Sequence, residues 1–317
     1  MDEPRDTTMT ALRAHERGGP EQLVVEPAPR PSPGNGEVLV RVEAAAITAD
    51  ELTWPETWEV DGTDRTPITP SHEFAGVVAG VGTDTQGFSL GDAVFGLVPF
   101  DRDGAAADYV VVPVTTVAHR SPSVSAQDAA AAVLPALTAW EALSDHVRVS
   151  PGQRLLVRGG SGAVGGMLTQ IGHVRGAEVT VTVSSEAGRA RAEVLGADHV
   201  VVVPRGSVPT GLAGFHASVD AVGDDVPAWL YEAVEDGGVL VTLQTPPDQD
   251  LAARSGISAV FFVVTPDAGR LSDLDALLAS GRLTVAVSEV FPLAAGRAAY
   301  VAAKAPGRTP GKVLLVP

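Results

Sequence analysis

The sequence predicts an α/β protein with two domains, one rich in short β-strands and one built on a doubly wound parallel sheet. Its 317 residues exceed the length of one average domain. Short apolar runs separated by turn residues fill the first third of the chain, and strands alternate with helices after about residue 150. The segment from Leu271 onward is too short to form a domain, so we expect it to return to the first one.

The composition is that of a globular chain and argues against two kinds of partner. Hydrophobic residues make up 45% of the sequence, and no apolar run approaches the roughly 18 residues typical of a membrane-spanning helix. The net charge of −17 opposes nucleic-acid binding, which needs clustered Lys and Arg. With no cysteine there is no disulfide, thiolate nucleophile or Cys-based zinc site. The acidic start shows no secretory signal, so a cytoplasmic location is expected.

Four brief runs predict strands in the first third of the chain. They are rich in small and β-branched apolar residues, and Gly, Pro or Asp breaks the chain between them. The runs are EVLVRVEAAAI (37–47), PSHEFAGVVAGVG (70–82), GDAVFGLVP (91–99) and ADYVVVP (107–113). Together they predict a small β-barrel-like domain, preceded by a loose tail over residues 1–8.

Strand-like runs alternate with helical patterns through the middle of the chain. The strand-like runs are RLLVRG (154–159), AEVTVTV (177–183), HVVVV (199–203), HASVDAVG (216–223), VLVTLQT (239–245) and AVFFVVT (259–265). Helices are expected from about residue 163 and over 229–238. This alternation predicts the doubly wound parallel sheet. A helix over 271–281, a strand-like segment over 283–293, another helix and a strand over 311–317 complete the chain.

A glycine-rich turn joins the first of these strands to its helix. Gly159, Gly162 and Gly165 have the spacing G-x-x-G-x-x-G, and the helix that follows is amphipathic. A pyrophosphate binds backbone N–H groups at a helix N-terminus, and side chains on the turn would hold it away. We therefore predict dinucleotide binding by a turn made of Gly159, Ser161, Gly162, Ala163, Val164 and Gly165.

The end of the next strand indicates which dinucleotide is bound. An NAD site has an acidic residue there, whereas an NADP site has small polar residues and a nearby base. Here Ser184 and Ser185 end the strand and Arg189 follows, although Glu186 lies between them. We predict that Ser184, Ser185 and Arg189 bind the 2′-phosphate of NADP(H). The other interpretation is that Arg189 and the nearby Arg191 are solvated helix residues.

With these motifs in order, the sequence resembles the medium-chain dehydrogenase/reductase superfamily and its zinc-independent quinone oxidoreductase branch. The resemblance extends over nearly the whole chain from Met9. It is carried by residues 18–47, HEFAGVVAGVG (72–82), GDAVFGL (91–97), AAAVLPALTAWEAL (130–143), GGSGAVG (159–165), LGADHVV (195–201) and the closing segment with PGKVLLVP (310–317). Taken singly, several of these segments are generic. Their order along the chain is what points specifically to this family.

The resemblance implies the domain plan. A GroES-like catalytic domain is expected over residues 1–120, a Rossmann NADP(H)-binding domain over 121–266, and a return to the catalytic domain over 267–317. The active-site cleft is expected where the two domains meet. A homodimer joined edge to edge through AVFFVVT (259–265) is also implied, and pairing would cover an apolar edge strand.

Zinc-dependent relatives use a cysteine after the first core strand, the histidine of the H-E pair, and a third ligand from the helix that enters the cofactor domain. Thr48 stands at the cysteine position, and VLPALTAWEA (133–142) contains neither Cys nor His. One imidazole and one carboxylate are too few for a catalytic zinc site. We predict no metal site, with His72 packing or hydrogen-bonding beside the cleft.

The resemblance also implies further contacts with the ribose and nicotinamide. These residues lie at strand ends, and the other interpretation is that they only pack there. For Lys312 the other interpretation is a solvated lysine at the edge of a strand. The residues are Gly223, Leu243 to Thr245, Phe261, Phe262, Val263 and Lys312.

We predict an NADPH-dependent reductase that passes hydride to a quinone or an α,β-unsaturated carbonyl. Without zinc an alkoxide is poorly stabilised, whereas a conjugated acceptor spreads its charge onto an oxygen that a hydrogen bond can hold. Thr48 and Thr53 are the predicted donors. Glu51, Trp54 and Thr138 are predicted to bind the small-molecule substrate, Trp54 by stacking or else as a packed loop residue, and Glu51 is expected to play a structural rather than an acid role.

Other functions stay open. Relatives often carry Asn and then Tyr after the first core strand, and this chain has Thr48 and then Thr53 or Trp54 near those positions. That change leaves room for a biosynthetic tailoring enzyme, or for a cofactor-binding sensor or structural protein with little catalysis. A hydrolase is a third hypothesis, because GGSGA (159–163) resembles a nucleophile elbow. Its fifth position is Ala163, and the downstream histidines lie inside the parallel-sheet pattern.

Overall fold

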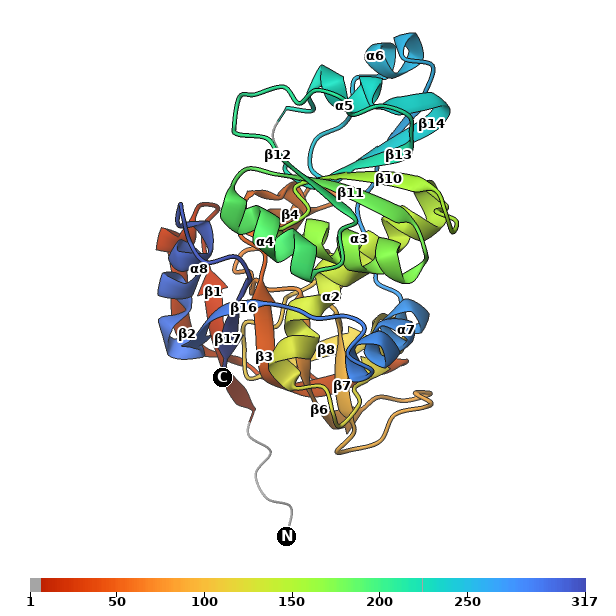
Figure 1. Ribbon diagram of the computed structural model, residues 1–317. Coiled ribbons are helices and arrows are strands. Elements are labelled where there is room, and N and C mark those ends of the chain that lie inside the picture. The colour runs from red at the N-terminus through yellow and green to blue at the C-terminus, as the bar shows by residue number, and fades with distance from the viewer. Residues whose placement is uncertain (1–6, 224) are drawn as a thin grey trace. The chain divides into compact units, whose positions relative to one another are not determined.

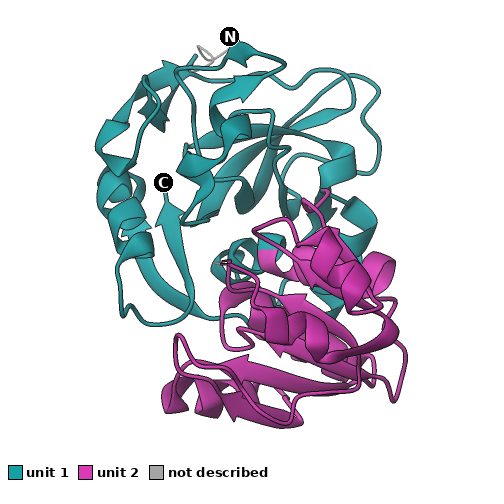
Figure 2. Ribbon diagram, turned by 90° about the horizontal axis from the view of Figure 1, so that it is seen from above, with its two compact units in different colours: residues 1–134, 266–280, 285–317 teal, residues 135–265, 281–284 magenta. Residues whose placement is uncertain are grey.

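The computed structural model describes residues 7–223 and 225–317, which divide into two compact units coloured teal and magenta in Figure 2. Unit 1 comprises residues 1–134, 266–280 and 285–317, and unit 2 comprises residues 135–265 and 281–284. The first division falls inside helix α2 (Ala126–Glu141), whereas the sequence placed the boundary before this helix. Of the expected loose tail, residues 1–6 lie outside the described residues, and Thr8 begins the first strand.

Unit 1 is built on a seven-stranded, mostly antiparallel sheet. The strand order is β16 (Val287–Pro292), β17 (Lys312–Val316), β3 (Glu37–Ile47), β6 (Glu73–Val81), β7 (Ala93–Leu97) and β9 (Val117–His119), with β8 (Tyr109–Pro113) paired to β3. Two hairpins accompany it, β1 (Thr8–Ala14) with β2 (Leu23–Pro29) and β4 (Glu59–Val60) with β5 (Thr63–Asp64). Strand β17 pairs antiparallel with β3, Val313 opposite Ile47, so the end of the chain completes this sheet.

The core of unit 1 joins segments from both ends of the chain. Phe74 on β6, Trp58 on the short helix α1 (Pro55–Trp58) and Tyr300 on helix α8 (Gly296–Lys304) are buried in one hydrophobic cluster. Helix α7 (Ala268–Ala279) belongs to the same unit. Together, the β-rich sheet and this shared core form the expected GroES-like domain.

Unit 2 is a six-stranded parallel sheet, which confirms the predicted doubly wound architecture. The strand order is β12 (His199–Val202), β11 (Glu178–Val183), β10 (Arg154–Arg158), β13 (Phe215–Asp220), β14 (Val234–Thr242) and β15 (Ser258–Phe261). The chain winds outward from β10 to β12, returns to β13 and winds outward again. The order therefore reverses between β10 and β13, and sheets of this kind bind ligands at the carboxyl ends of the strands at such a reversal.

Helices flank both faces of this sheet. In Figure 1, α3 (Ala163–Val174) and α4 (Glu186–Val194) lie below it, and α5 (Ala228–Glu232) and α6 (Gln249–Arg254) lie above it. The helix expected over 229–238 ends at Glu232, because Val234 already pairs with Phe215 and starts β14 before a shift in register. None of the described helices is both long and apolar enough to cross a membrane.

Candidate active site and cofactor site

The glycine-rich turn lies at the carboxyl end of β10, beside the reversal of strand order. Gly159 has φ +87°, a conformation that favours glycine, and its N–H donates to the carbonyl oxygen of Thr182 at 2.9 Å. The N–H of Gly160 donates to the same oxygen at 3.2 Å. The turn is thus fastened to β11 by its backbone before α3 begins.

Close packing explains two of the glycines. A Cβ at Gly165 would lie 2.1 Å from the carbonyl oxygen of Gly159, and a Cβ at Gly160 would lie 2.4 Å from the Cβ of Val181. Neither position accepts a side chain without moving backbone or a strand. Gly165 was predicted from its spacing. Gly160 was missed, because its requirement comes from a neighbouring strand rather than from the motif.

The start of α3 fits an anionic group. Gly162 is the N-cap and has no side chain with which to cap the helix. The N–H groups of Ala163, Val164 and Gly165 belong to the first turn, which has no preceding helical carbonyl for them to bind. The helix dipole favours negative charge at this end. These residues therefore fit the pyrophosphate of a dinucleotide.

The carboxyl ends of β13 and β14 adjoin this turn. A Cβ at Gly159 would lie 2.9 Å from Val222, and one at Gly223, where φ is +89°, would lie 2.8 Å from Gln244. Gly159, Gly223 and the predicted segment Leu243 to Thr245 thus lie at one edge of the sheet. Phe261 ends β15 and is 38% exposed, and Val263 beyond it is 61% exposed. Phe262 packs against the ring of His146, with 4.5 Å between centroids.

The predicted 2′-phosphate residues lie at the end of β11 and the start of α4. Ser184 and Ser185 are exposed, and the Ser185 hydroxyl caps α4 by accepting from Gly188 N at 3.2 Å. Arg189 donates to Glu186 Oε2 and to the Val200 carbonyl, each at 2.9 Å, and its side chain is 37% exposed. The three predicted residues thus lie close together along the chain, with the carboxylate of Glu186 paired to the guanidinium of Arg189, and their contact with a 2′-phosphate stays a prediction.

In unit 1 the predicted catalytic residue Thr48 belongs to a hydrogen-bonded triangle. Its hydroxyl lies 3.0 Å from Glu73 Oε1, to which it donates, and it accepts from Lys312 Nζ at 3.1 Å. Lys312 Nζ also donates to the same Glu73 oxygen. Thr48 is partly exposed, while Glu73 and Lys312 are buried. Burial raises the pKa of Glu73, and the charge of Lys312 opposes that rise.

Glu51 is a second buried carboxylate beside Thr48. Its Oε1 accepts from Tyr300 OH at 2.7 Å and from Thr48 N at 3.3 Å, and its Oε2 accepts from Ser71 N at 2.9 Å. Only 1% of the residue is exposed. Burial raises the pKa of Glu51 to about 7, while the hydrogen bonds from Tyr300 and Ser71 act in the opposite direction. This geometry matches the structural role expected for Glu51, whereas its contact with substrate stays a prediction.

The predicted substrate residue Trp54 packs against one aromatic ring, that of Phe100. Its ring meets Phe100 edge to face at 5.5 Å, and Phe100 meets His72 at 5.1 Å. Phe100 was not identified from the sequence, because it lies 46 positions beyond Trp54 in another loop. Thr53 is exposed and donates its hydroxyl to the Asp50 carbonyl at 2.6 Å. Thr138, the remaining predicted substrate residue, is buried in α2.

The donor groups near His72 do not fit a catalytic zinc ion. Burial lowers the pKa of His72 to about 4, so the ring is neutral, and its Nδ1 lies 3.2 Å from the Val98 carbonyl. The neighbouring carboxylates, Glu51 and Glu73, already accept several hydrogen bonds. Among residues 7–223 and 225–317 no group of three or more His, Cys, Asp or Glu could hold a metal ion.

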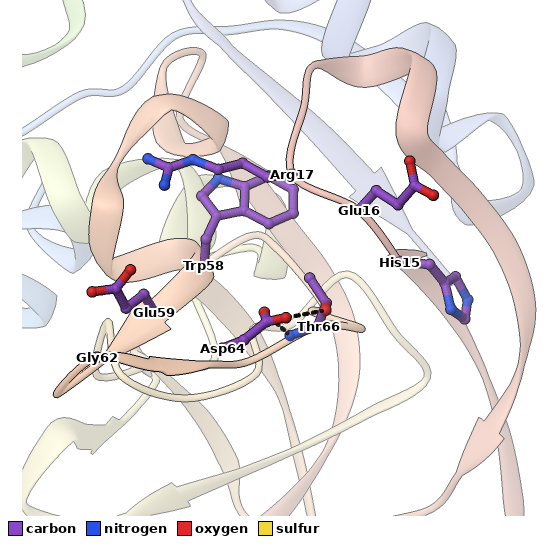
Figure 3. A pocket seen from close by; sticks show the side chains of 8 residues that line it. All are labelled: His15, Glu16, Arg17, Trp58, Glu59, Gly62, Asp64 and Thr66. Carbon is purple, nitrogen blue, oxygen red and sulfur yellow. Dashed lines mark hydrogen bonds between the residues drawn. The ribbon is translucent and has the colours of Figure 1, made fainter.

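A separate pocket of about 450 Å³ lies in unit 1, and Figure 3 shows the side chains that line it. They are His15, Glu16, Arg17, Trp58, Glu59, Gly62, Asp64 and Thr66. Trp58 is 2% exposed and donates its indole N–H to Leu52 O, and Asp64 binds the backbone N–H and hydroxyl of Thr66. The rim carries charges of both signs and contains none of the predicted site residues.

Comparison with known proteins identifies the family. Residues 34–123 match the family described as "Alcohol dehydrogenase GroES-like domain", and residues 195–315 match the one described as "Zinc-binding dehydrogenase". A probable quinone oxidoreductase of Schizosaccharomyces pombe is 30% identical, covering 93% of this chain and 92% of that protein. A 2-methylene-furan-3-one reductase of Solanum lycopersicum is 29% identical, covering 89% of this chain and 72% of that protein.

Among solved structures, the quinone oxidoreductase of Coxiella burnetii has the same fold, with a TM-score of 0.88 and 23% identity over 98% of this chain and 99% of that chain. The chain therefore belongs to the medium-chain dehydrogenase/reductase superfamily, whose nicotinamide cofactor the glycine-rich turn fits. Within the superfamily it is a member of the quinone oxidoreductase-like branch, and the predicted resemblance is confirmed.

Proposed function

We propose that the protein is an NADPH-dependent reductase that transfers hydride to a quinone or an α,β-unsaturated carbonyl without zinc. The observation that carries the proposal is the glycine-rich turn at the strand reversal, where Gly160 and Gly165 admit no side chain and α3 begins uncapped. The two conjugated acceptor classes are supported by the relatives named as a quinone oxidoreductase and a furanone reductase. The donor groups around His72, which do not fit zinc, are consistent with an acceptor that needs no Lewis acid.

Bound NADPH supplies the hydride, and the residues of this chain hold the reactants and stabilise charge. The turn from Gly159 to Gly165 binds the pyrophosphate, and the strand ends at Gly223 and Leu243 to Thr245 line the ribose and nicotinamide. Trp54, steadied by Phe100, offers an aromatic face to a flat acceptor. Thr48 and Thr53 donate hydrogen bonds to the oxygen that becomes negative as hydride adds. A threonine hydroxyl is too weak an acid to give up its proton efficiently, so the final proton comes from water.

Preference for NADPH over NADH belongs to the same proposal. The exposed hydroxyls of Ser184 and Ser185 leave room for a 2′-phosphate, and no acidic side chain occupies these two positions. Arg189 lies one helical turn beyond them and supplies a positive charge. We further propose a homodimer joined through β15 and a cytoplasmic location, as expected from the sequence.

The test is steady-state oxidation of NADPH with a panel of quinones, enones and alkenals. We expect turnover with at least one class, and we expect Thr48→Val and Thr53→Val each to lower kcat/KM by about tenfold to a hundredfold. Tight NADPH binding without oxidation across the panel would favour the sensor or the tailoring-enzyme hypothesis. Wild-type rates in both variants would place the oxyanion donor elsewhere.

A further inference from the structure

Lys312 is unusual in this chain for its residue type and its burial. It and Lys304 are the only lysines among 22 Lys and Arg residues. Lys304 lies on α8 with 35% of its side chain exposed and pairs with Asp50 at 3.4 Å. The Lys312 side chain is 8% exposed. Burying an ammonium costs free energy unless hydrogen bonds and opposite charges compensate. The partners of Lys312 therefore indicate what it does.

The ammonium group of Lys312 is hydrogen-bonded to Thr48 and to Glu73. Lys312 starts β17, Glu73 starts β6, and Thr48 follows β3, so three neighbouring strands bring the groups together. Lys312 Nζ donates to both Thr48 Oγ1 and Glu73 Oε1. The second oxygen of Glu73 accepts from Leu134 N at 3.0 Å. Thr48 is partly exposed, whereas Glu73 and Lys312 are buried, so Thr48 is the member of the triangle that solvent reaches.

We infer that Lys312 is a positioning residue that acts through Thr48, holding and polarising its hydroxyl as a donor to the oxyanion. This inference rests on the proposed function. The hydroxyl can rotate from Glu73 toward the substrate oxygen while Lys312 continues to bind both Thr48 Oγ1 and Glu73. Hydrogen bonds in series strengthen one another, so a hydroxyl that accepts from an ammonium is a better donor. No proton leaves Lys312 in this step.

This role differs from the cofactor contact that the family resemblance implies for Lys312. A cofactor contact predicts weaker NADPH binding when the lysine is removed. The positioning role predicts an unchanged Kd for NADPH and a lower kcat. If Lys312 is purely structural, Lys312→Met alone should lower stability. Replacing Glu73 as well, so that no unpaired charge stays buried, should then restore activity.

The decisive variant is the double substitution Lys312→Met with Glu73→Gln. It removes both buried charges together, so it avoids the uncompensated carboxylate that Lys312→Met alone would leave. The new amide can still accept from Leu134 N and donate to Thr48 Oγ1. We expect near wild-type thermal stability and NADPH Kd, with kcat for 9,10-phenanthrenequinone lower by about fivefold to tenfold. Lys304→Met is the matched control and should leave kcat within about twofold.

The same double substitution is then placed in the Thr48→Val background. If Lys312 acts through Thr48, it should lower kcat there by less than about twofold, since coupled groups show non-additive losses. A loss as large as in the wild-type background would overturn the inference. So would a raised NADPH Kd with unchanged kcat, or wild-type kcat in the charge-balanced variant.

The lysine count allows a measurement that does not depend on turnover. Protein labelled with ¹³C at lysine Cε gives two resonances, one from Lys312 and one from Lys304. We expect NADPH to leave the Lys312 resonance in place, and Thr48→Val to shift it while Lys304 stays unchanged. A shift of Lys312 on adding NADPH would indicate a cofactor contact and overturn the inference. A wild-type kcat for Thr48→Val would show that Thr48 does not stabilise the oxyanion. The lysine resonances report separately whether Lys312 contacts Thr48 or the cofactor.

Discussion

Tyr300 on α8 donates its hydroxyl to the buried carboxylate of Glu51 at 2.7 Å, across 249 positions of the chain. Both residues are buried, and burial together with the nearby Glu51 raises the pKa of Tyr300 well above 10, so the phenol remains a donor. Glu51 in turn accepts from the backbone of Thr48 and Ser71. A helix near the end of the chain thereby fixes the loop that carries the proposed catalytic threonine.

Removing the Tyr300 hydroxyl should destabilise the protein. Tyr300→Phe deprives a buried carboxylate of a donor. At pH 8, above the Glu51 pKa of about 7, we expect a loss of about 1.5–3 kcal/mol in the free energy of unfolding, the range for hydrogen bonds to charged groups. Urea denaturation measures the loss. Tyr109→Phe, on the partly exposed β8, is the control and should change stability by less than about 0.5 kcal/mol. Equal losses in the two variants would show that the Tyr300 bond to Glu51 is not special.

Glu51 should make stability fall as pH rises. Its folded pKa of about 7 exceeds its usual value of 4.5, so the folded protein binds the proton more tightly than the unfolded chain. The resulting stabilisation is full below about pH 4.5 and is lost as pH rises through 7. At 1.36 kcal/mol per pKa unit, the advantage of wild type over Glu51→Gln should shrink by about 3 kcal/mol between pH 4.5 and 8.

The variant comparison isolates Glu51 from other groups. His72 acts in the opposite direction, since its folded pKa of about 4 lies below its usual 6.5 and its contribution is lost as pH falls through 4. The titratable groups that face Glu51 are Tyr300, Lys312 and Glu73, and all three remain in Glu51→Gln, as do the backbone N–H groups of Thr48 and Ser71. Urea unfolding at several pH values gives the difference curve. A difference that is flat with pH would contradict the raised pKa.

Gly165→Ala should impair cofactor binding. The added Cβ would lie 2.1 Å from the Gly159 carbonyl oxygen. Removing this steric clash requires α3 to shift away from the turn. We expect NADPH Kd to rise by at least about tenfold, because the pyrophosphate loses aligned backbone donors. Gly269→Ala, at the start of α7 in unit 1, is the control and should leave the Kd unchanged. Fluorescence titration with NADPH measures the Kd of both variants. An unaltered Kd for Gly165→Ala would show that the pyrophosphate does not bind at this turn.

The glycine pattern shows what local sequence can predict. Gly159, Gly162 and Gly165 were identifiable because a strand, a turn and a helix follow one another along the chain. Gly160 was not, since its need depends on Val181 across the sheet. The links from Lys312 to Thr48 and from Tyr300 to Glu51 were equally out of reach, because they join residues more than 240 positions apart. The fold class can be predicted from local sequence patterns. The contacts that hold the loop of Thr48 and Glu51 form only through tertiary packing.

Arg189→Ala should separate the two nicotinamide cofactors. If Arg189 pairs with the 2′-phosphate, its removal weakens NADPH binding by roughly 1–3 kcal/mol and changes NADH binding little. Because Arg189 also binds the Val200 carbonyl, thermal unfolding of the variant is needed as a check on folding. Isothermal titration with each cofactor gives the comparison. Equal weakening of NADPH and NADH would mean that Arg189 supports the fold and does not recognise the phosphate.

Isotope labelling tests whether hydride passes directly from NADPH to a conjugated acceptor. The enzyme is given NADPH carrying deuterium at the transferable position of the nicotinamide, together with an enone, in ordinary water. We expect a saturated ketone with one deuterium at the β-carbon and a solvent hydrogen at the α-carbon, which mass spectrometry and NMR can locate. NADPH that is bound but never consumed, or a reduced product without deuterium at the β-carbon, would contradict direct hydride transfer.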